Sequence, residues 1–179
     1  VYIQSGLWKL RLIPRSIRNG RYDMWLPAQG ALNFGTGFTS PDSASTFTIP
    51  SAAAKAVTVG AYDAGTGSAA PFSGRGYIVE IGGSLMVKPE LAAPGVNVLV
   101  PSASGMARVS GTSYATPFVT GSAALLMEWG IVRGNDAFLY GEKLKAYLIK
   151  GAEPLAGAAV PDTQTGWGRL CLKNSLPQA

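Results

Sequence analysis

The stretch Gly111-Thr112-Ser113-Tyr114-Ala115-Thr116-Pro117 predicts an abrupt change from an extended segment to a helix. Pro117 has no N–H group, so a helix tolerates it only near the first turn, where N–H groups have no intrahelical partner. This places Ser113 at or beside the helix N-terminus, where free N–H groups and the positive end of the helix dipole favour negative charge. Such a place suits a serine whose attack creates an oxyanion, although a plain helix cap also explains it.

Two arrangements of a serine hydrolase put the nucleophile between a strand and a helix. In one, the serine lies in a G-x-S-x-G turn and its acid and His partners follow it in the chain. Residues 111–115 nearly match that turn, but the chain contains no His. In the other arrangement Asp and His precede the serine, so the absence of His fits a chain that lacks its N-terminal side.

The residues around this junction predict an α/β domain. We expect a buried parallel strand at 56–61, an extended segment at 91–100, a strand at 106–110 that pairs back on it, and helices at 113–129 and 141–150. In the last helix, Leu144, Tyr147 and Leu148 share one face. Glu142, Lys143 and Lys145 lie largely on the opposite, polar face.

Residues 1–34 have a different pattern. Gly6–Leu12 alternates apolar and polar side chains, and Asn19-Gly20 is a hairpin-turn dipeptide. We therefore predict antiparallel strands at 7–13 and 21–26. This region also carries five basic residues against Asp23, but the charges are spaced along the chain, which favours a solvated strand face over a nucleic-acid site.

Several stretches resemble the subtilisin family of serine proteases. Residues 111–121 are similar to its nucleophile-helix signature. Four other stretches, three before this signature and one after it, occur in the family's order: Val57–Asp63, Phe72–Gly76, Lys88–Val96 and Gly166–Leu170. Together they extend the resemblance over about residues 46–175. The similarity is greatest to clostridial and related Firmicutes subtilases, including the Csp-type proteases of spore germination. Phe118 stands where many subtilases have a His that is not catalytic.

This resemblance implies a fold and an activity. Residues 35–179 would form the C-terminal half of a subtilisin-like parallel-sheet domain, and residues 1–34 the last strands of an inserted jelly-roll domain. The activity implied is that of a serine endopeptidase, with Ser113 as nucleophile and backbone oxyanion donor. Catalytic Asp and His would lie upstream of this chain, so the chain alone would be inactive.

The resemblance also implies residues that bind the substrate. Thr48, Ile49 and Pro50 would line the pocket for the residue before the cleaved bond, with Thr48 near its base and a cis Ile49–Pro50 bond. Gly111 and Thr112 would contact substrate beside the nucleophile. The family's oxyanion Asn is expected upstream; Asn33 is the nearby candidate within this sequence, whereas Asn97 is expected to be structural.

Two alternatives remain at the level of sequence. A Ser–Lys hydrolase would need a buried lysine beside Ser113, for which Lys55 and Lys88 are candidates. A pseudoprotease that binds partners would have the same fold without the upstream triad members. The upstream sequence would separate this second alternative from a protease.

The expected partners are a peptide or protein substrate and the N-terminal half of the same protease, with neither nucleic acid nor a membrane. No apolar run approaches the roughly 20 residues of a membrane span. The implied chemistry needs no cofactor, although subtilases often bind calcium through carbonyls that leave no sequence signature. Cys171 is the only cysteine, so cytoplasmic, spore-associated and secreted locations stay open.

Overall fold

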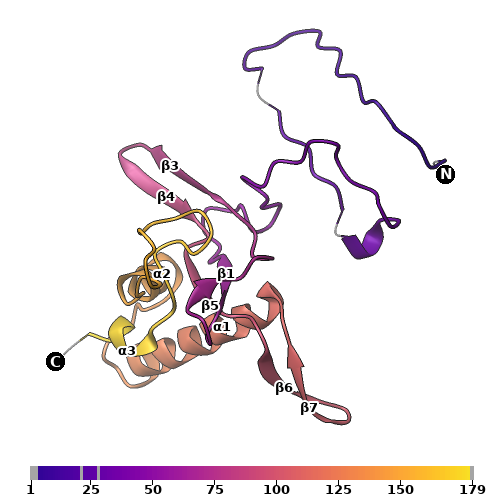
Figure 1. The fold of residues 1–179 in the computed structure, drawn as a ribbon. Coiled ribbons are helices and arrows are strands. Elements are labelled where there is room, and N and C mark those ends of the chain that lie inside the picture. The colour runs from indigo at the N-terminus through magenta and orange to yellow at the C-terminus, as the bar shows by residue number, and fades with distance from the viewer. Residues whose placement is uncertain (1–3, 21, 28, 178–179) are drawn as a thin grey trace. The chain divides into compact units, whose positions relative to one another are not determined.

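The computed structural model describes residues 4–20, 22–27 and 29–177. The chain divides into an N-terminal unit, Val1–Gly37, and a C-terminal unit, Phe38–Ala179 (Figure 1). All seven strands and the three α-helices of the described residues belong to the C-terminal unit.

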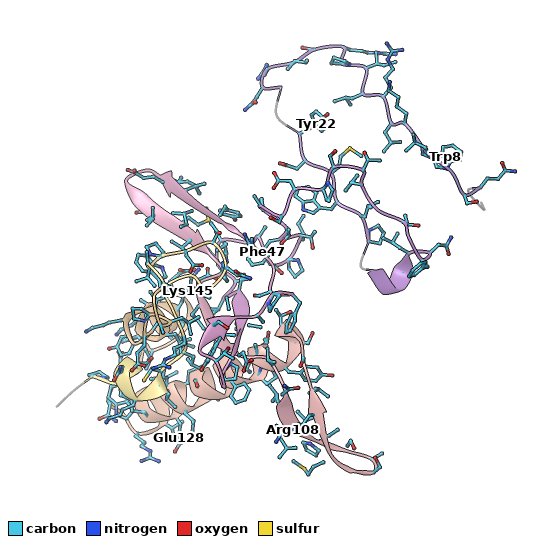
Figure 2. The ribbon with its side chains drawn as sticks, in the orientation of Figure 1. Trp8, Tyr22, Phe47, Arg108, Glu128 and Lys145 are labelled. Atoms are coloured by element: carbon cyan, nitrogen blue, oxygen red, sulfur yellow. The ribbon has the colours of Figure 1, made fainter. Side chains whose placement is uncertain are left out.

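The N-terminal unit does not form the predicted hairpin. Its described residues contain one regular element, the 3-10 helix η1 (Gln29–Ala31), and no strand at 7–13 or 22–26; residue 21 lies outside the described residues. Trp8 and Leu10 are 66% and 75% exposed, and Figure 2 shows the labelled Trp8 side chain on an extended trace. An isolated two-stranded ribbon is marginally stable without a third strand or a packing partner, which explains why alternation did not produce strands here.

The C-terminal unit is built on a three-stranded sheet with the order β2-β1-β5. Its strands are β1 (Val59–Asp63), β2 (Ser68–Ala69) and β5 (Leu91–Pro94). β1 runs parallel to β5 and antiparallel to β2. The predicted buried parallel strand is therefore confirmed, but it begins at Val59 and not at Ala56.

The other edge of β5 is covered by residues 167–170. Ala92 N–H donates to Gly168 O and Leu170 N–H donates to Ala92 O, both at 2.8 Å. Gly168 has φ +119, and a Cβ there would lie 2.2 Å from Glu153 O, so this close approach requires glycine.

Two antiparallel hairpins extend from this sheet. One pairs β6 (Val98–Ser102) with β7 (Gly105–Val109), as predicted from the sequence. The other pairs β3 (Tyr77–Ile81) with β4 (Ser84–Lys88) and was not predicted. Its signal was present in the sequence, because Gly82-Gly83 separates two runs of β-forming residues and both glycines have positive φ.

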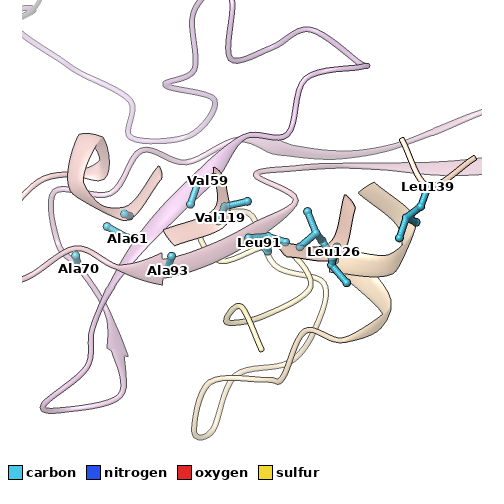
Figure 3. Close-up of a cluster of buried hydrophobic side chains, with 10 residues drawn as sticks. Val59, Ala61, Ala70, Leu91, Ala93, Val119, Leu126 and Leu139 are labelled. Atoms are coloured by element: carbon cyan, nitrogen blue, oxygen red, sulfur yellow. The ribbon is translucent and has the colours of Figure 1, made fainter. Parts of the chain in front are cut away.

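Helix α1 (Thr112–Met127) packs against β1 and β5 and continues into the π-helix η2 (Glu128–Val132). Helix α2 (Gly141–Lys150) has the predicted bounds, and α3 (Leu172–Ser175) packs beside it. Figure 3 shows the core between α1 and the sheet. Its buried side chains include those of Val59, Ala61, Leu91, Ala93, Val119 and Leu126.

The helical stretch Thr112–Val132 is long and apolar enough, by length and composition alone, to cross a membrane. The expectation that no apolar run approaches that length is therefore wrong. A core helix passes the same test, and Ala115, Val119 and Leu126 are buried in the core cluster.

Candidate active site

Ser113 is the second residue of α1, and its side chain is exposed. Because the first N–H groups of a helix have no partner one turn earlier, the backbone around Ser113 offers donors to an anion in front of the helix. The structure therefore gives Ser113 the location predicted for it: an exposed side chain at a helix N-terminus. The location alone does not establish a catalytic role.

Two glycines, Gly111 in the turn before Ser113 and Gly95 at the end of β5, allow the start of α1 to approach the sheet. Gly111 has φ +154, a backbone conformation that disfavours other residues, and its N–H donates to Gly95 O at 2.8 Å. A Cβ on Gly95 would lie 2.6 Å from the Ala61 Cβ and 3.5 Å from the Ala115 Cβ. The end of β5, the middle of β1 and the start of α1 can meet only because Gly95 has no side chain.

Pro117 lies deeper in the helix than the sequence predicted. It is the sixth residue of α1, which begins at Thr112. A residue with an N–H group at that position would donate to the Ser113 carbonyl, so proline leaves that carbonyl without its intrahelical donor. The first turn of α1 is therefore held by fewer backbone hydrogen bonds than an ordinary helix start.

The segment that carries Ser113 has few charges. Between Gly95 and Met127, Arg108 is the only charged residue. It lies on β7 (Figure 2), and its Nη1 donates to Asn97 O at 3.1 Å. Asn97 has φ +52 and its N–H donates to Ser110 Oγ at 3.0 Å, which fits the structural role expected for it.

The Ser–Lys alternative has no support in this geometry. Lys88 is fully buried, and its Nζ donates to Ala56 O at 2.7 Å and Thr58 Oγ1 at 3.2 Å. Lys55 is exposed. Within the described residues, no lysine forms a hydrogen bond with Ser113.

The predicted substrate-binding residues Thr48, Ile49 and Pro50 form an exposed loop. Ile49 is 91% exposed, and the Ile49–Pro50 peptide bond is cis, as predicted. Before the loop, Thr46 N–H donates to Arg75 O at 2.7 Å, and Arg75 N–H donates to Thr46 Oγ1 at 2.8 Å. Their contact with substrate stays a prediction, as does an oxyanion role for Asn33, which belongs to the N-terminal unit.

A buried ionic cluster, which we call the Glu90 cluster, consists of Lys88, Glu90 and Lys145. Glu90 Oε1 lies 2.7 Å from Lys88 Nζ and 2.5 Å from Lys145 Nζ, and Glu90 Oε2 accepts the Thr58 N–H at 2.7 Å. The sequence prediction for Lys145 was wrong, because its side chain is 13% exposed and its ammonium group binds Glu90 and the Ala54 carbonyl. Helical periodicity placed this lysine on the polar face, and its ion pair with Glu90 draws the ammonium group inward.

Among the described residues, no group of three or more His, Cys, Asp or Glu side chains could hold a metal ion. A hollow of about 340 Å³ lies beside the Glu90 cluster. Its walls come from β4, α2 and Trp167, and they do not include Ser113.

Residues 19–168 match the family model described as the subtilase family. The Clostridium perfringens CspB protease is similar in structure, with a TM-score of 0.70 and 44% identity over 78% of this chain and 30% of that chain. The self-cleaved protease domain of PatA is similar at a TM-score of 0.54 and 30% identity, over 71% of this chain and 42% of that one.

Curated sequences agree over a shorter stretch. The PII-type proteinase of Lactococcus lactis subsp. cremoris is 38% identical over 67 residues, which are 37% of this chain and 4% of that protein. The chain thus spans less than a third of CspB and a small part of the lactococcal proteinase.

Proposed function

This chain belongs to the subtilase family, and from that premise we propose that it forms the C-terminal part of a serine endopeptidase whose nucleophile is Ser113. The observation that carries the proposal is the exposed Ser113 at the start of α1, directly after Gly111, whose N–H bonds to Gly95 O at the end of β5. The likeness to CspB over most of the chain supports the same assignment.

The proposed reaction is acyl transfer to Ser113. Its Oγ attacks the carbonyl carbon of a peptide bond, and a His from the upstream part of the protein takes the hydroxyl proton. That His then donates the proton to the departing amine, while an upstream Asp orients its ring. The Ser113 N–H donates to the oxyanion, and water releases the acyl group in a second attack. No cofactor enters this chemistry.

We also propose how the substrate is held. Thr48, Ile49 and Pro50 would contact the residue before the cleaved bond, and Gly111 and Thr112 would contact the chain beside Ser113. The high exposure of Ile49 supports this role, because an apolar side chain on an exposed loop is available to an extended peptide.

The N-terminal half of the same protease is the proposed partner of this chain. Helix α1 is rich in apolar residues and buries only some of them. It leaves the large side chains of Tyr114, Phe118 and Leu125 exposed. Contiguous apolar surface of this kind is typical of an interface. Residues 1–34 are likewise proposed to complete an inserted jelly-roll domain, whose remaining strands would cover their exposed apolar side chains.

The test is peptide hydrolysis by the full-length protein, with and without Ser113→Ala. Removing a nucleophile of this type reduces kcat by about a millionfold, whereas Ser104→Ala, on the exposed β6–β7 turn, should leave kcat within about twofold because surface substitutions have small effects. The 179-residue chain alone should be inactive. Hydrolysis that survives Ser113→Ala would contradict the proposal, and a full-length protein without hydrolysis or Ser113 labelling would favour a partner-binding pseudoprotease.

A further inference from the structure

We propose that Lys145 is a positioning residue for the substrate. Its ammonium group, together with the Lys88 ammonium group and the Tyr77 hydroxyl, holds the backbone of residues 52–56 and so fixes the exposed loop Thr48–Pro50. The inference rests on the proposed function, because it assigns to that loop the substrate contact proposed above. Lys145 itself would not touch the reacting atoms.

The proposal rests on the backbone carbonyl groups of residues 52–56, which accept hydrogen bonds from side chains of β3 and α2. Tyr77 Oη donates to Ala52 O at 3.0 Å. Lys145 Nζ donates to Ala54 O at 2.8 Å and to Ala56 O at 3.4 Å. Every second backbone carbonyl from residue 52 to residue 56 therefore accepts a hydrogen bond from a side chain. In a β-strand, a neighbouring strand would supply these donors.

Lys88 and Glu90 complete this arrangement. Lys88 Nζ donates to Ala56 O at 2.7 Å, and Glu90 Oε1 forms ion pairs with both lysines, so the carboxylate offsets one of the two positive charges. Buried ammonium groups are costly unless they are paired and hydrogen-bonded, and these groups are both. The cluster is therefore a rigid support for residues 52–58 and not a set of solvated charges.

The loop is also fixed at its other end. Thr46 N–H donates to Arg75 O and Arg75 N–H donates to the Thr46 hydroxyl oxygen. The Phe47 ring lies against the backbone of Gly74 and Gly76, where a Cβ would come within 2.7 Å and 2.9 Å of it. Residues 48–50 are thus a short exposed connection between two anchored segments, the second of which begins at Ser51, whose carbonyl accepts a hydrogen bond from Thr58 Oγ1 at 2.6 Å. An exposed loop with fixed ends can present side chains to a peptide without a large ordering cost on binding.

Lys145 is the informative member of the cluster. It comes from α2, which contributes no other predicted site residue, and it joins that helix to Ala54 and Ala56 in the segment that follows the loop. Its removal leaves Glu90 paired with Lys88, so the protein should still fold. The carbonyl of Ala54 would then lose the hydrogen bond from Lys145 Nζ, and the loop would lose one of its supports.

The experiment compares Lys145→Met with Lys143→Met in the full-length protease. Lys143 lies on the same helix, but its ammonium group pairs at the surface with Asp136. Small displacements of substrate-positioning groups cost up to about a hundredfold in rate. We expect Lys145→Met to raise KM for extended peptides about tenfold with kcat within about twofold, and Lys143→Met to change neither by more than about twofold.

A second variant and a second readout separate positioning from general loss of structure. Tyr77→Phe removes the donor to Ala52 O and should raise KM in the same direction, by about threefold. The labelling rate of Ser113 by a small fluorophosphonate, which does not need the pocket, should be unchanged in both variants. Lys145→Arg, which restores the charge and donors, should recover part of the lost affinity.

An unchanged KM in both Lys145→Met and Tyr77→Phe would overturn the proposal. So would a labelling rate that falls in proportion to peptide hydrolysis, because the variant would then have lost structure and not substrate position. If the unmodified protease itself shows no Ser113-dependent labelling, the proposed function fails first, and the positioning role is refuted with it.

Discussion

The two units of the chain distribute their side chains in opposite ways. In the N-terminal unit, Trp8 is 66% exposed although it is one of the largest apolar residues. In the C-terminal unit, Lys88 is fully buried although it carries a charge. The difference shows that burial follows the availability of partners. Lys88 has Glu90, Thr58 and the Ala56 carbonyl, whereas the described residues of the N-terminal unit form no sheet against which an apolar side chain could pack.

Amide hydrogen exchange should show the largest difference between the units. Amides of β1 and β5 are hydrogen-bonded inside the core, and exposing them requires opening a packed structure at a cost of about 4 kcal/mol or more. We expect them to exchange at least about a thousandfold more slowly than amides of residues 7–13. Comparable protection in both segments, measured by mass spectrometry on peptide fragments, would mean that the N-terminal unit forms a stable sheet.

The substitution Glu90→Gln should produce the next largest effect. It leaves the two ammonium groups of Lys88 and Lys145 buried without a carboxylate, and breaking a buried ionic network costs about 3–5 kcal/mol. Urea unfolding measures this loss. Glu142→Gln makes the same change at an exposed position of α2 and should alter the free energy of unfolding by less than about 0.5 kcal/mol.

Truncating one leucine in each unit compares their packing directly. Leu126 is fully buried between α1 and the sheet, so Leu126→Ala should cost about 2–5 kcal/mol through lost burial and the cavity left behind. Leu10 is 75% exposed in the 179-residue chain, so Leu10→Ala in that chain should change the free energy of unfolding by less than about 0.5 kcal/mol. A similar loss in the two variants would show that Leu10 packs in solution.

The smallest expected effect depends on pH. The ammonium group of Lys143, which donates a hydrogen bond to Asp136, lowers the pKa of that carboxyl below its ordinary value. An acid with a lower pKa in the folded state stabilises the fold above the unfolded pKa, near pH 4, and loses that contribution as the pH falls through the folded value. The melting temperature should therefore fall below about pH 4, and less so in Asp136→Asn; an identical pH profile in the variant would exclude this pair as the cause.

Local patterns in the sequence predicted much of the C-terminal unit. Residues 141–150 form a helix because apolar side chains recur at helical spacing, and residues 98–109 form a hairpin because two extended runs flank a short turn. Gly111 and Pro117 placed Ser113 near a helix start, although α1 begins earlier than expected.

The failures of prediction have a common physical cause in contacts between distant parts of the chain. The alternation of residues 7–13 favours a strand, but a strand also needs a partner, which no local pattern supplies. Lys145 occupies a polar helical position, yet Glu90, far earlier in the chain, draws it inward. The supports of the Thr48–Pro50 loop likewise come from β3, β4 and α2, so the sequence revealed the loop and not what holds it.

Residues 167–170 pair with the edge of β5, and this pairing affects how the chain folds during synthesis. A ribosome delivers β1 and β5 well before Gly168 and Leu170, which bond to Ala92. Until then the nascent sheet has an unpaired edge, and such edges pair readily with other chains. We predict that nascent chains arrested before residue 165 are digested by protease. Chains arrested after residue 176, and extended by a linker so that they clear the exit tunnel, should be digested more slowly. Equal digestion of the two would contradict the prediction. A segment translated more than 70 residues after β5 would then be the part that closes the sheet.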